Sequence, residues 1–304
     1  EGATVAVTRD NRAVVYMGED SRFEYIYKFV SRDTIKPGGA AANATLLDHG
    51  TLYVAQFNAD GKGRWIALTY GQGPLTAANG FADQGEVLIK ARQASDLLGG
   101  TKMDRPEWLT IDPASGWVYC TLTNNSQRGE PGKPGVDAAN PRANNVWGHI
   151  VRWNEAGGDG TALSFNWDIF VLAGQPTVTD ARKPSSNITL DNLFNSPDGL
   201  AFDSFGRMWI QTDGNFSNTG VYAGQGNNKM LCADPATGEI RRFLVGPSGC
   251  EITGLTFTPD GRTMFINVQH PGEVGSHPNR PTPPAGVSMD DYVAANPLAF
   301  SQWP

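Results

Sequence analysis

Several kinds of segment are missing from the 304-residue chain. No apolar run approaches the roughly 18 residues that a membrane-spanning helix needs, and no charged-then-apolar leader stands at the start. The chain opens directly on Glu-Gly-Ala-Thr-Val-Ala-Val, a stretch that is typical of the middle of a domain. We therefore expect a mature or cleaved piece of a larger protein.

Cysteine is scarce. The three cysteines, Cys120, Cys232 and Cys250, have no Cys-X-X-Cys spacing, so a zinc site is unsupported. Two alternatives stay open for them: one disulfide, with Cys232–Cys250 as the favoured pair in an oxidising compartment, or three buried thiols. His149 and His270 are isolated in the sequence, and we expect them to be structural.

Positive charge is also in short supply. The chain has 24 basic and 31 acidic residues and a net charge of −7, whereas a nucleic-acid surface would need a basic stripe. An anionic substrate remains compatible with this balance, because bound metal ions reverse the local sign of the charge. The signatures G-X-S-X-G, H-E-X-X-H, Walker and Rossmann are missing too.

What the chain does contain is 36 glycines, 20 prolines, 8 tryptophans and 14 phenylalanines, a profile that favours many short strands joined by turns. One pattern recurs: an apolar run, a turn with Asp or Gly, and a second apolar run. Each copy is predicted to be a β-hairpin. The five copies span residues 3–20, 44–57, 108–123, 199–214 and 252–269.

The spacing of these copies indicates a repeat architecture. The last apolar residues before the first two turns, Val7 and Leu47, lie about one propeller blade of roughly 40–50 residues apart. The prediction is an all-β fold, a β-propeller that is partial here, with few short helices such as 93–98 and 288–296. We expect residues 1–304 to form a single propeller domain or its C-terminal part. The alternative is a β-sandwich with long loops.

Two segments interrupt the repeats. Residues 124–145 and 270–286 are rich in Gly, Pro and Asn, so we expect both to be long, exposed surface loops.

Oxygen-bearing side chains recur near the start of the first strand of every copy. In a propeller the innermost strands line a central channel, so these side chains are expected to converge at one mouth. Such a cluster suits hard cations such as calcium, magnesium or ferric iron. For any one acid, a turn or solvent exposure is the better explanation, and only the recurrence before the hairpins favours a metal site. The set is Glu1, Asn43, Glu107, Asp198 and Glu251.

Other charged residues near these positions allow two interpretations. Arg105 lies two residues before Glu107 and is predicted to share its strand face, where it either binds an anion or forms a salt bridge to Glu107 or Asp104. Residues 17–20 and Glu24 form a second acidic patch, for which a solvated hairpin end is favoured over a structural ion. Asp213 is interpreted as a turn residue.

Long segments of the chain resemble the PhoX-type alkaline phosphatases. The segments are "EGATVAV", "YMGEDSRFEYIYKFVS", "MDRPEWLTIDP", "NSPDGLAFDSFGRMWIQTDG" and "GCEITGLTFTPDGRTMFINVQHPGE". The resemblance extends over nearly the whole chain and implies a β-propeller, with six blades expected in the complete protein. It also implies a monomeric enzyme that hydrolyses small phosphate monoesters and is exported by the twin-arginine route to the periplasm or beyond.

The resemblance further implies a metal cluster of several calcium ions and two ferric ions. Glu1, Glu107 and Asp198 match the family's metal ligands, Glu251 matches with less support, and Arg105 matches a phosphate-binding residue. The family's iron-binding cysteine belongs to a segment that this chain does not contain. The chain is thus expected to be the C-terminal half of such an enzyme, completed by the N-terminal part of the same protein.

Two other functions remain as alternatives. A calcium-dependent lactonase also uses Glu, Asn and Asp at a propeller mouth. A non-catalytic propeller could instead use calcium for stability and its long loops for binding a partner.

Overall fold

The computed structural model describes residues 1–215, 217–247 and 249–270. The chain divides into two compact units. The first unit comprises residues 1–120, 127–144 and 151–169, and the second unit comprises residues 121–126, 145–150 and 170 onward.

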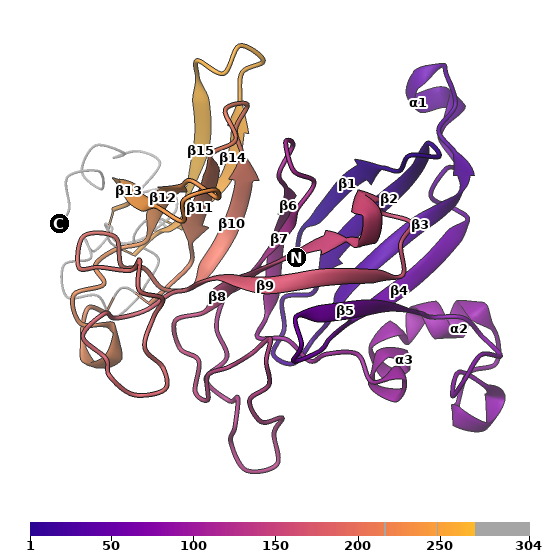
Figure 1. Cartoon of the computed structure of the whole chain (residues 1–304), viewed down its shortest axis with the longest axis horizontal. Coiled ribbons are helices and arrows are strands. Elements are labelled where there is room, and N and C mark those ends of the chain that lie inside the picture. The colour runs from indigo at the N-terminus through magenta and orange to yellow at the C-terminus, as the bar shows by residue number, and fades with distance from the viewer. Residues whose placement is uncertain (216, 248, 271–304) are drawn as a thin grey trace, which may run out of the picture. The chain divides into compact units, whose positions relative to one another are not determined.

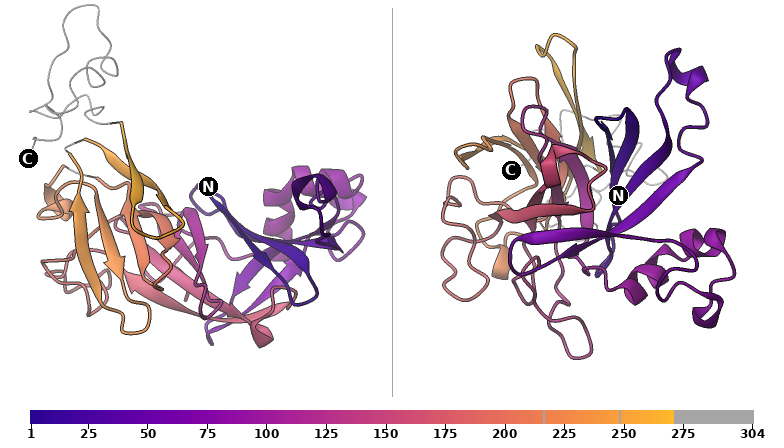
Figure 2. Two further views of the ribbon diagram at one scale, coloured as in Figure 1. Left: turned by 90° about the horizontal axis from the view of Figure 1, so that it is seen from above. Right: turned by 45° about the vertical axis from the view of Figure 1, so that its right-hand side comes forward.

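The first unit is built on a run of antiparallel strands. The strands β1 (Ala3–Val7), β2 (Arg12–Gly18), β3 (Ile26–Thr34), β4 (Gly50–Phe57) and β5 (Lys62–Ala67) pair successively with one another. Figures 1 and 2 show β1 to β4 side by side in this order. Their β-branched and aromatic residues suit such a pleated, half-buried surface.

The sheet continues from β5 through four further strands. Its order is β5, β9 (Ser164–Leu172), β8 (His149–Glu155), β7 (Val118–Leu122) and β6 (Pro106–Ile111). The last strand, β6, lies close to β1 and β2, so the starts of β1 and β6 come near each other. This approach positions the candidate site of the first unit.

The helices are few and short. They are α1 (Gly39–Ala42), α2 (Gln84–Ile89) and α3 (Ala91–Leu98), with 3-10 turns at Ala77–Asn79, Ala156–Gly158 and Gly220–Tyr222. The prediction at 93–98 is confirmed by α3, whereas the prediction at 288–296 lies outside the described residues. Within the described ranges, every helix is too short to cross a bilayer.

Helix α2 was not predicted, although its signal is present in the sequence. Asp83 caps the helix by accepting a hydrogen bond from the backbone N–H of Glu86 at 2.9 Å, and the Glu86 carboxylate accepts one from Ala82 N–H at 2.8 Å. This arrangement resembles a capping box with Asp in place of Ser or Thr, except that Glu86 accepts from the residue before the N-cap.

The second unit contains a four-stranded antiparallel sheet and a hairpin. The sheet has the order β10 (Pro197–Phe202), β11 (Met208–Thr212), β12 (Lys229–Ala233) and β13 (Ile240–Val245). The hairpin consists of β14 (Glu251–Phe257) and β15 (Met264–Gln269).

The all-β, propeller-type fold with few short helices is confirmed, as are four of the five predicted hairpins. The prediction of a hairpin at 44–57 is wrong. Residues 39–42 form α1, and β4 pairs with β3 rather than with a strand before it. The amide of Asn43 is used locally, since it accepts from Lys36 N–H and donates to the carbonyls of Lys36 and Gly39, each at 2.8 Å. Asn43 therefore does not start an inner strand.

Each unit has an apolar core of its own. In the first unit Tyr16, Trp65, Trp153 and Phe165 form a chain of ring contacts with centroids 5.1–6.3 Å apart. Helices α2 and α3 add a second cluster around Val54, which is fully buried. In the second unit the core is built on Trp209, Met230, Cys250 and Ile252. Aromatic burial of this kind dominates the stability of such sheets.

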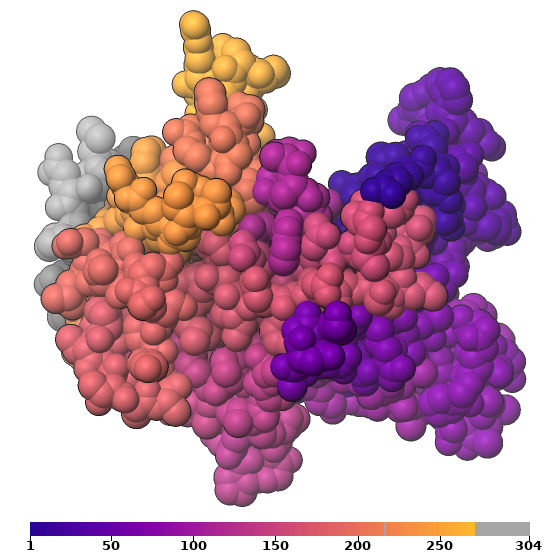
Figure 3. All heavy atoms as spheres, in the orientation of Figure 1, coloured from indigo at the N-terminus to yellow at the C-terminus, as the bar shows by residue number. Residues whose placement is uncertain are grey.

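The cysteines and the long loops can now be placed. All three cysteines lie in the described residues, and none is disulfide-bonded, which agrees with the free-thiol alternative. Residues 124–145 contain no named helix or strand, and their magenta atoms lie at the lower edge of Figure 3. Their stem is not exposed as expected, because Arg128 is buried and donates from Nε to Asp104 Oδ1 at 2.8 Å. The second loop, from 271 to 286, lies outside the described residues.

Candidate metal centre

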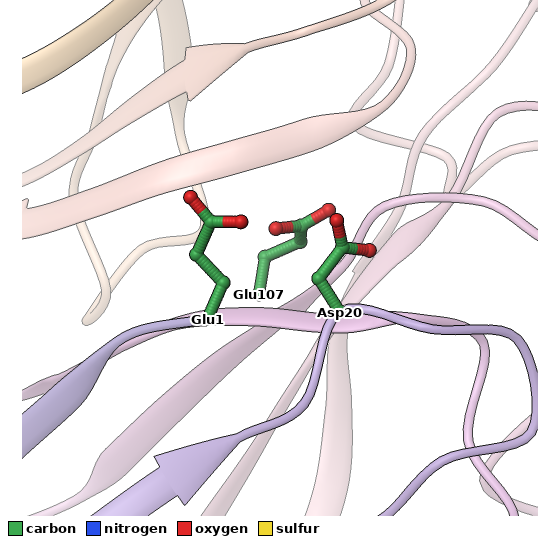
Figure 4. A group of neighbouring side chains, drawn as sticks. All are labelled: Glu1, Asp20 and Glu107. Atoms are coloured by element: carbon green, nitrogen blue, oxygen red, sulfur yellow. The ribbon is translucent and has the colours of Figure 1, made fainter.

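Three carboxylates meet in the first unit. Oxygens of Glu1, Asp20 and Glu107 all lie within 4.8 Å of one another (Figure 4). Glu1 precedes β1, Asp20 follows β2, and Glu107 belongs to β6, so the two ends of one hairpin and one strand distant in sequence contribute the acids. We call this group the first acidic site.

Two glycines make this approach possible. A Cβ on Gly18 would lie 2.8 Å from the Glu107 carbonyl oxygen, and a Cβ on Gly2 would lie 3.0 Å from the same atom. Gly2 also has φ of +95°, which a residue with a side chain rarely adopts. The absence of side chains at these two positions lets the ends of β1 and β2 contact the backbone of β6, which brings Glu1 and Asp20 to Glu107.

Arg105 lies against the first acidic site. It donates from Nε to Asp20 Oδ1 at 2.7 Å and from Nη2 to Asp20 Oδ2 at 3.1 Å, and Nη2 also contacts Glu107 Oε1 at 3.4 Å. The predicted salt bridge to Glu107 is therefore present, while the main partner is Asp20. Arg105 is partly exposed and Glu107 is buried, so the guanidinium offsets much of the cost of burying that carboxylate.

A second group of acids lies in the second unit. Oxygens of Asp198, Asp213 and Glu251 also lie within 4.8 Å of one another. Asp198 belongs to β10, Asp213 directly follows β11, and Glu251 begins β14. We call this group the second acidic site. Asp213 is placed by a hydrogen bond from its backbone N–H to the carbonyl of Ser196 at 3.1 Å.

In the second acidic site the charged form of a carboxylate is disfavoured. Burial, together with the charge of Asp213, raises the pKa of Glu251. Gln269 stabilises the Glu251 side chain by donating from Nε2 to Oε2 at 2.7 Å. Carboxylates held this close favour a bound cation or a shared proton.

The structure brings together the predicted acids in pairs, Glu1 with Glu107 and Asp198 with Glu251. Sequence reasoning missed the third member of each group. Asp20 was assigned to a solvated hairpin end and Asp213 to a turn; Asp20 is partly buried and Asp213 is exposed, and each lies close to two predicted ligands. The signal that could have identified them is their position, because each follows the second strand of a hairpin whose first strand carries a predicted ligand.

The donor set of both sites fits hard cations. Each site offers carboxylate oxygens only, which are the ligands of calcium, magnesium and ferric iron rather than of soft metals. The buried amide oxygen of Gln211, which stands opposite Asp198 and Gly199 in the pairing of β10 with β11, also has no hydrogen-bond partner among the described residues. The residues present therefore fit metal ions, although they do not distinguish calcium from iron.

The chain was compared with known proteins. The family described as alkaline phosphatase PhoX matches residues 1–272. Pseudomonas fluorescens PhoX in complex with vanadate, a transition state analogue, is 57% identical with a TM-score of 0.86, over 90% of this chain and 49% of that chain. In the comparison with curated proteins nothing matches.

Two further solved structures are similar only remotely. Virginiamycin B lyase from Staphylococcus aureus is 13% identical with a TM-score of 0.30, over 86% of this chain and 68% of that chain. The gluconolactonase XC5397 from Xanthomonas campestris is 10% identical with a TM-score of 0.24, over 88% of this chain and 92% of that chain. Neither likeness carries any weight here.

The family match covers most of the residues, and the chain spans about half the length of the Pseudomonas fluorescens PhoX structure. The expected resemblance is confirmed: this chain belongs to the PhoX family of alkaline phosphatases.

Proposed function

We propose that the protein is a metal-dependent phosphatase that hydrolyses phosphate monoesters. The observation that carries this proposal is the planar cation Arg105 held against three clustered carboxylates, in a chain 57% identical to a PhoX structure that contains vanadate. A cationic fork beside a site for metal ions is suited to a doubly charged phosphate group.

The chemistry of the substrate explains the need for such a site. Phosphate monoesters hydrolyse extremely slowly without a catalyst, and the transferring phosphoryl group must be positioned and its charge neutralised. Bound metal ions supply charge neutralisation and an activated oxygen nucleophile in sites of this kind. The chain's own residues have to hold the ions and orient the phosphate.

The proposed roles divide between the two acidic sites. Glu1, Asp20 and Glu107 hold cations in the first acidic site, and Asp198, Asp213 and Glu251 hold cations in the second. Arg105 binds phosphoryl oxygens. It is partly exposed, and its position is fixed by the bidentate bond to Asp20, so the group is aligned in advance of substrate binding.

The finer assignments follow the family resemblance. We propose several calcium ions and two ferric ions, with one iron bound by a cysteine from outside these 304 residues. The protein is proposed to act as a monomer in the periplasm or outside the cell, after twin-arginine export. The membership of the PhoX family supports these assignments.

The deciding experiment measures hydrolysis of p-nitrophenyl phosphate and of a lactone side by side, with elemental analysis of the same full-length preparation. We expect phosphate-ester hydrolysis that is lost after the metals are removed by chelators and restored when calcium and iron are returned. Lactone hydrolysis with a single divalent ion would replace the proposal by the lactonase function. If metal-loaded protein hydrolyses neither substrate, the proposal fails in favour of a binding role.

A further inference from the structure

Gln211 is a fully buried amide in β11 of the second unit. Its Nε2 donates to the backbone carbonyl of Gly254 at 3.4 Å, while its Oε1 has no hydrogen-bond partner among the described residues. A buried acceptor without a partner costs free energy, so such an atom calls for a ligand or another explanation.

A β-bulge places this amide beside Asp198. In the pairing of β10 with β11, Pro197 faces Thr212 and Leu200 faces Ile210, so Asp198 and Gly199 together stand opposite Gln211. A Cβ on Gly199 would lie only 2.3 Å from Gln211 Oε1. The amide oxygen therefore occupies space that a side chain at position 199 would need.

The direction of the side chain agrees with this placement. Residues i and i+2 of an extended segment point to the same face, and Gln211 stands two residues before Asp213, a member of the second acidic site. If the extended backbone of β11 continues to Asp213, which directly follows the strand, the amide and the Asp213 carboxylate point to the same face.

The amide nitrogen of Gln211 donates to a second β-bulge. In the pairing of β14 with β15, Thr253 faces Asn267 and Leu255 faces Ile266, which leaves Gly254 as the extra residue, with φ of +57°. Gln211 Nε2 donates to the carbonyl of this residue, three positions after Glu251. Gln211 consequently connects the bulge that carries Asp198 with the strand that begins at Glu251.

We propose that Gln211 is a further ligand of the second acidic site and presents a neutral oxygen to the cation held there. Its Nε2 bond fixes β14, and its Oε1 faces the cation bound by Asp198, Asp213 and Glu251. The ligand class is a hard cation that accepts mixed carboxylate and amide oxygens, with Ca²⁺ as the probe. This inference rests on the metal-binding role proposed above.

The test is a Ca²⁺ titration of the metal-free, full-length protein by calorimetry, in an E107Q background that weakens the first acidic site. Binding at the second acidic site is defined as the part of the titration that D198N abolishes. Q211M keeps the volume of the side chain and removes both polar atoms. We expect it to weaken this binding by at least about 10- to 100-fold, the effect already typical of losing a group that only supports the metal ligands.

The matched control is I210V, which changes a buried neighbour on the same strand. It is expected to leave the Ca²⁺ affinity unchanged, so a loss confined to Q211M is not a general effect of altering β11. Equal affinities in the parent and in Q211M would overturn the inference.

If Q211M does not fold, Q211E replaces it in the test, because Q211E keeps the shape of the side chain and its oxygen and adds a negative charge. If Oε1 faces the cation, Q211E retains or increases the Ca²⁺ affinity of the parent at the same pH, because a carboxylate oxygen replaces the amide oxygen. A loss of affinity in folded Q211E would overturn the inference. Phosphatase activity is measured separately. If the enzyme is active but D198N abolishes no part of its Ca²⁺ binding, this inference is refuted and the proposed function stands.

Discussion

Arg105 and Asp20 stand 85 positions apart in sequence and are joined by two hydrogen bonds of 2.7 and 3.1 Å. Arg105 also contacts Glu107 at 3.4 Å, so one guanidinium is shared between two members of the first acidic site. This arrangement explains how a buried carboxylate is tolerated in β6, and in the proposed function the same guanidinium is the cation that binds phosphate.

The first prediction concerns the shape of that cation. R105K keeps the charge and loses the planar fork, so we expect kcat/KM for p-nitrophenyl phosphate to fall by about 10- to 100-fold in the full-length enzyme. R32K is the control, because Arg32 is an exposed arginine paired with Asp33. Equal activity of R105K and the parent would show that only the charge matters.

The second prediction concerns metal retention. E107Q removes one charge from the first acidic site, and we expect a lower metal content by elemental analysis together with a loss of activity of about 100-fold or more. E239Q is the matched control, since Glu239 is exposed and paired with Arg241. Full metal content in E107Q would exclude Glu107 as a ligand.

The third prediction concerns the contact between β2 and β6. G18A would place a Cβ 2.8 Å from the Glu107 carbonyl oxygen, and we expect it to lower the free energy of unfolding by about 1–3 kcal/mol. G135A is the control, because Gly135 has open space around it and, like Gly18, no positive φ. The measurement is denaturant unfolding, and similar midpoints for the two variants would refute the steric argument.

The fourth prediction concerns a buried ion pair in the first unit. Lys28 Nζ lies 3.4 Å from Glu155 Oε2, and both side chains are buried. K28M leaves the carboxylate without its cation and should cost about 3–5 kcal/mol, whereas K28M/E155Q should regain most of that loss. The Gln side chain removes the charge and keeps an oxygen that accepts from the Tyr16 hydroxyl and the Trp65 N–H. K36M, at an exposed lysine, is the control. A double variant no more stable than K28M would contradict the prediction.

The fifth prediction concerns pH. Burial raises the pKa of Glu155 from 4.5 to about 7, although Lys28 opposes the shift. The folded state then binds more protons than the unfolded state between these two values, so this group makes the free energy of unfolding fall as pH rises from 4.5 to 7. E155Q should flatten the dependence of the unfolding free energy on pH between 4.5 and about 7, regardless of how stable the variant itself is. An unchanged slope in E155Q would assign the effect to another group.

The alternation of apolar runs with Asp- and Gly-containing turns was sufficient to predict the hairpins at β1–β2, β6–β7, β10–β11 and β14–β15, because turn chemistry and two-residue periodicity are local. The same local logic failed at 44–57, where β4 takes β3 as its partner and Asn43 serves its own loop. Strand pairing depends on what the rest of the sheet offers, and a short apolar run does not specify it.

The sequence by itself determined the strand-rich fold and four of the six clustered acids, since ligands at the starts of repeated strands share a position in the repeat. Only the tertiary structure added Asp20 and Asp213. It also showed Arg105 bonded to Asp20 and Gln211 between two bulges. The physical reason is that close approach depends on glycines such as Gly2 and Gly18, whose missing side chains matter only once two distant backbones meet.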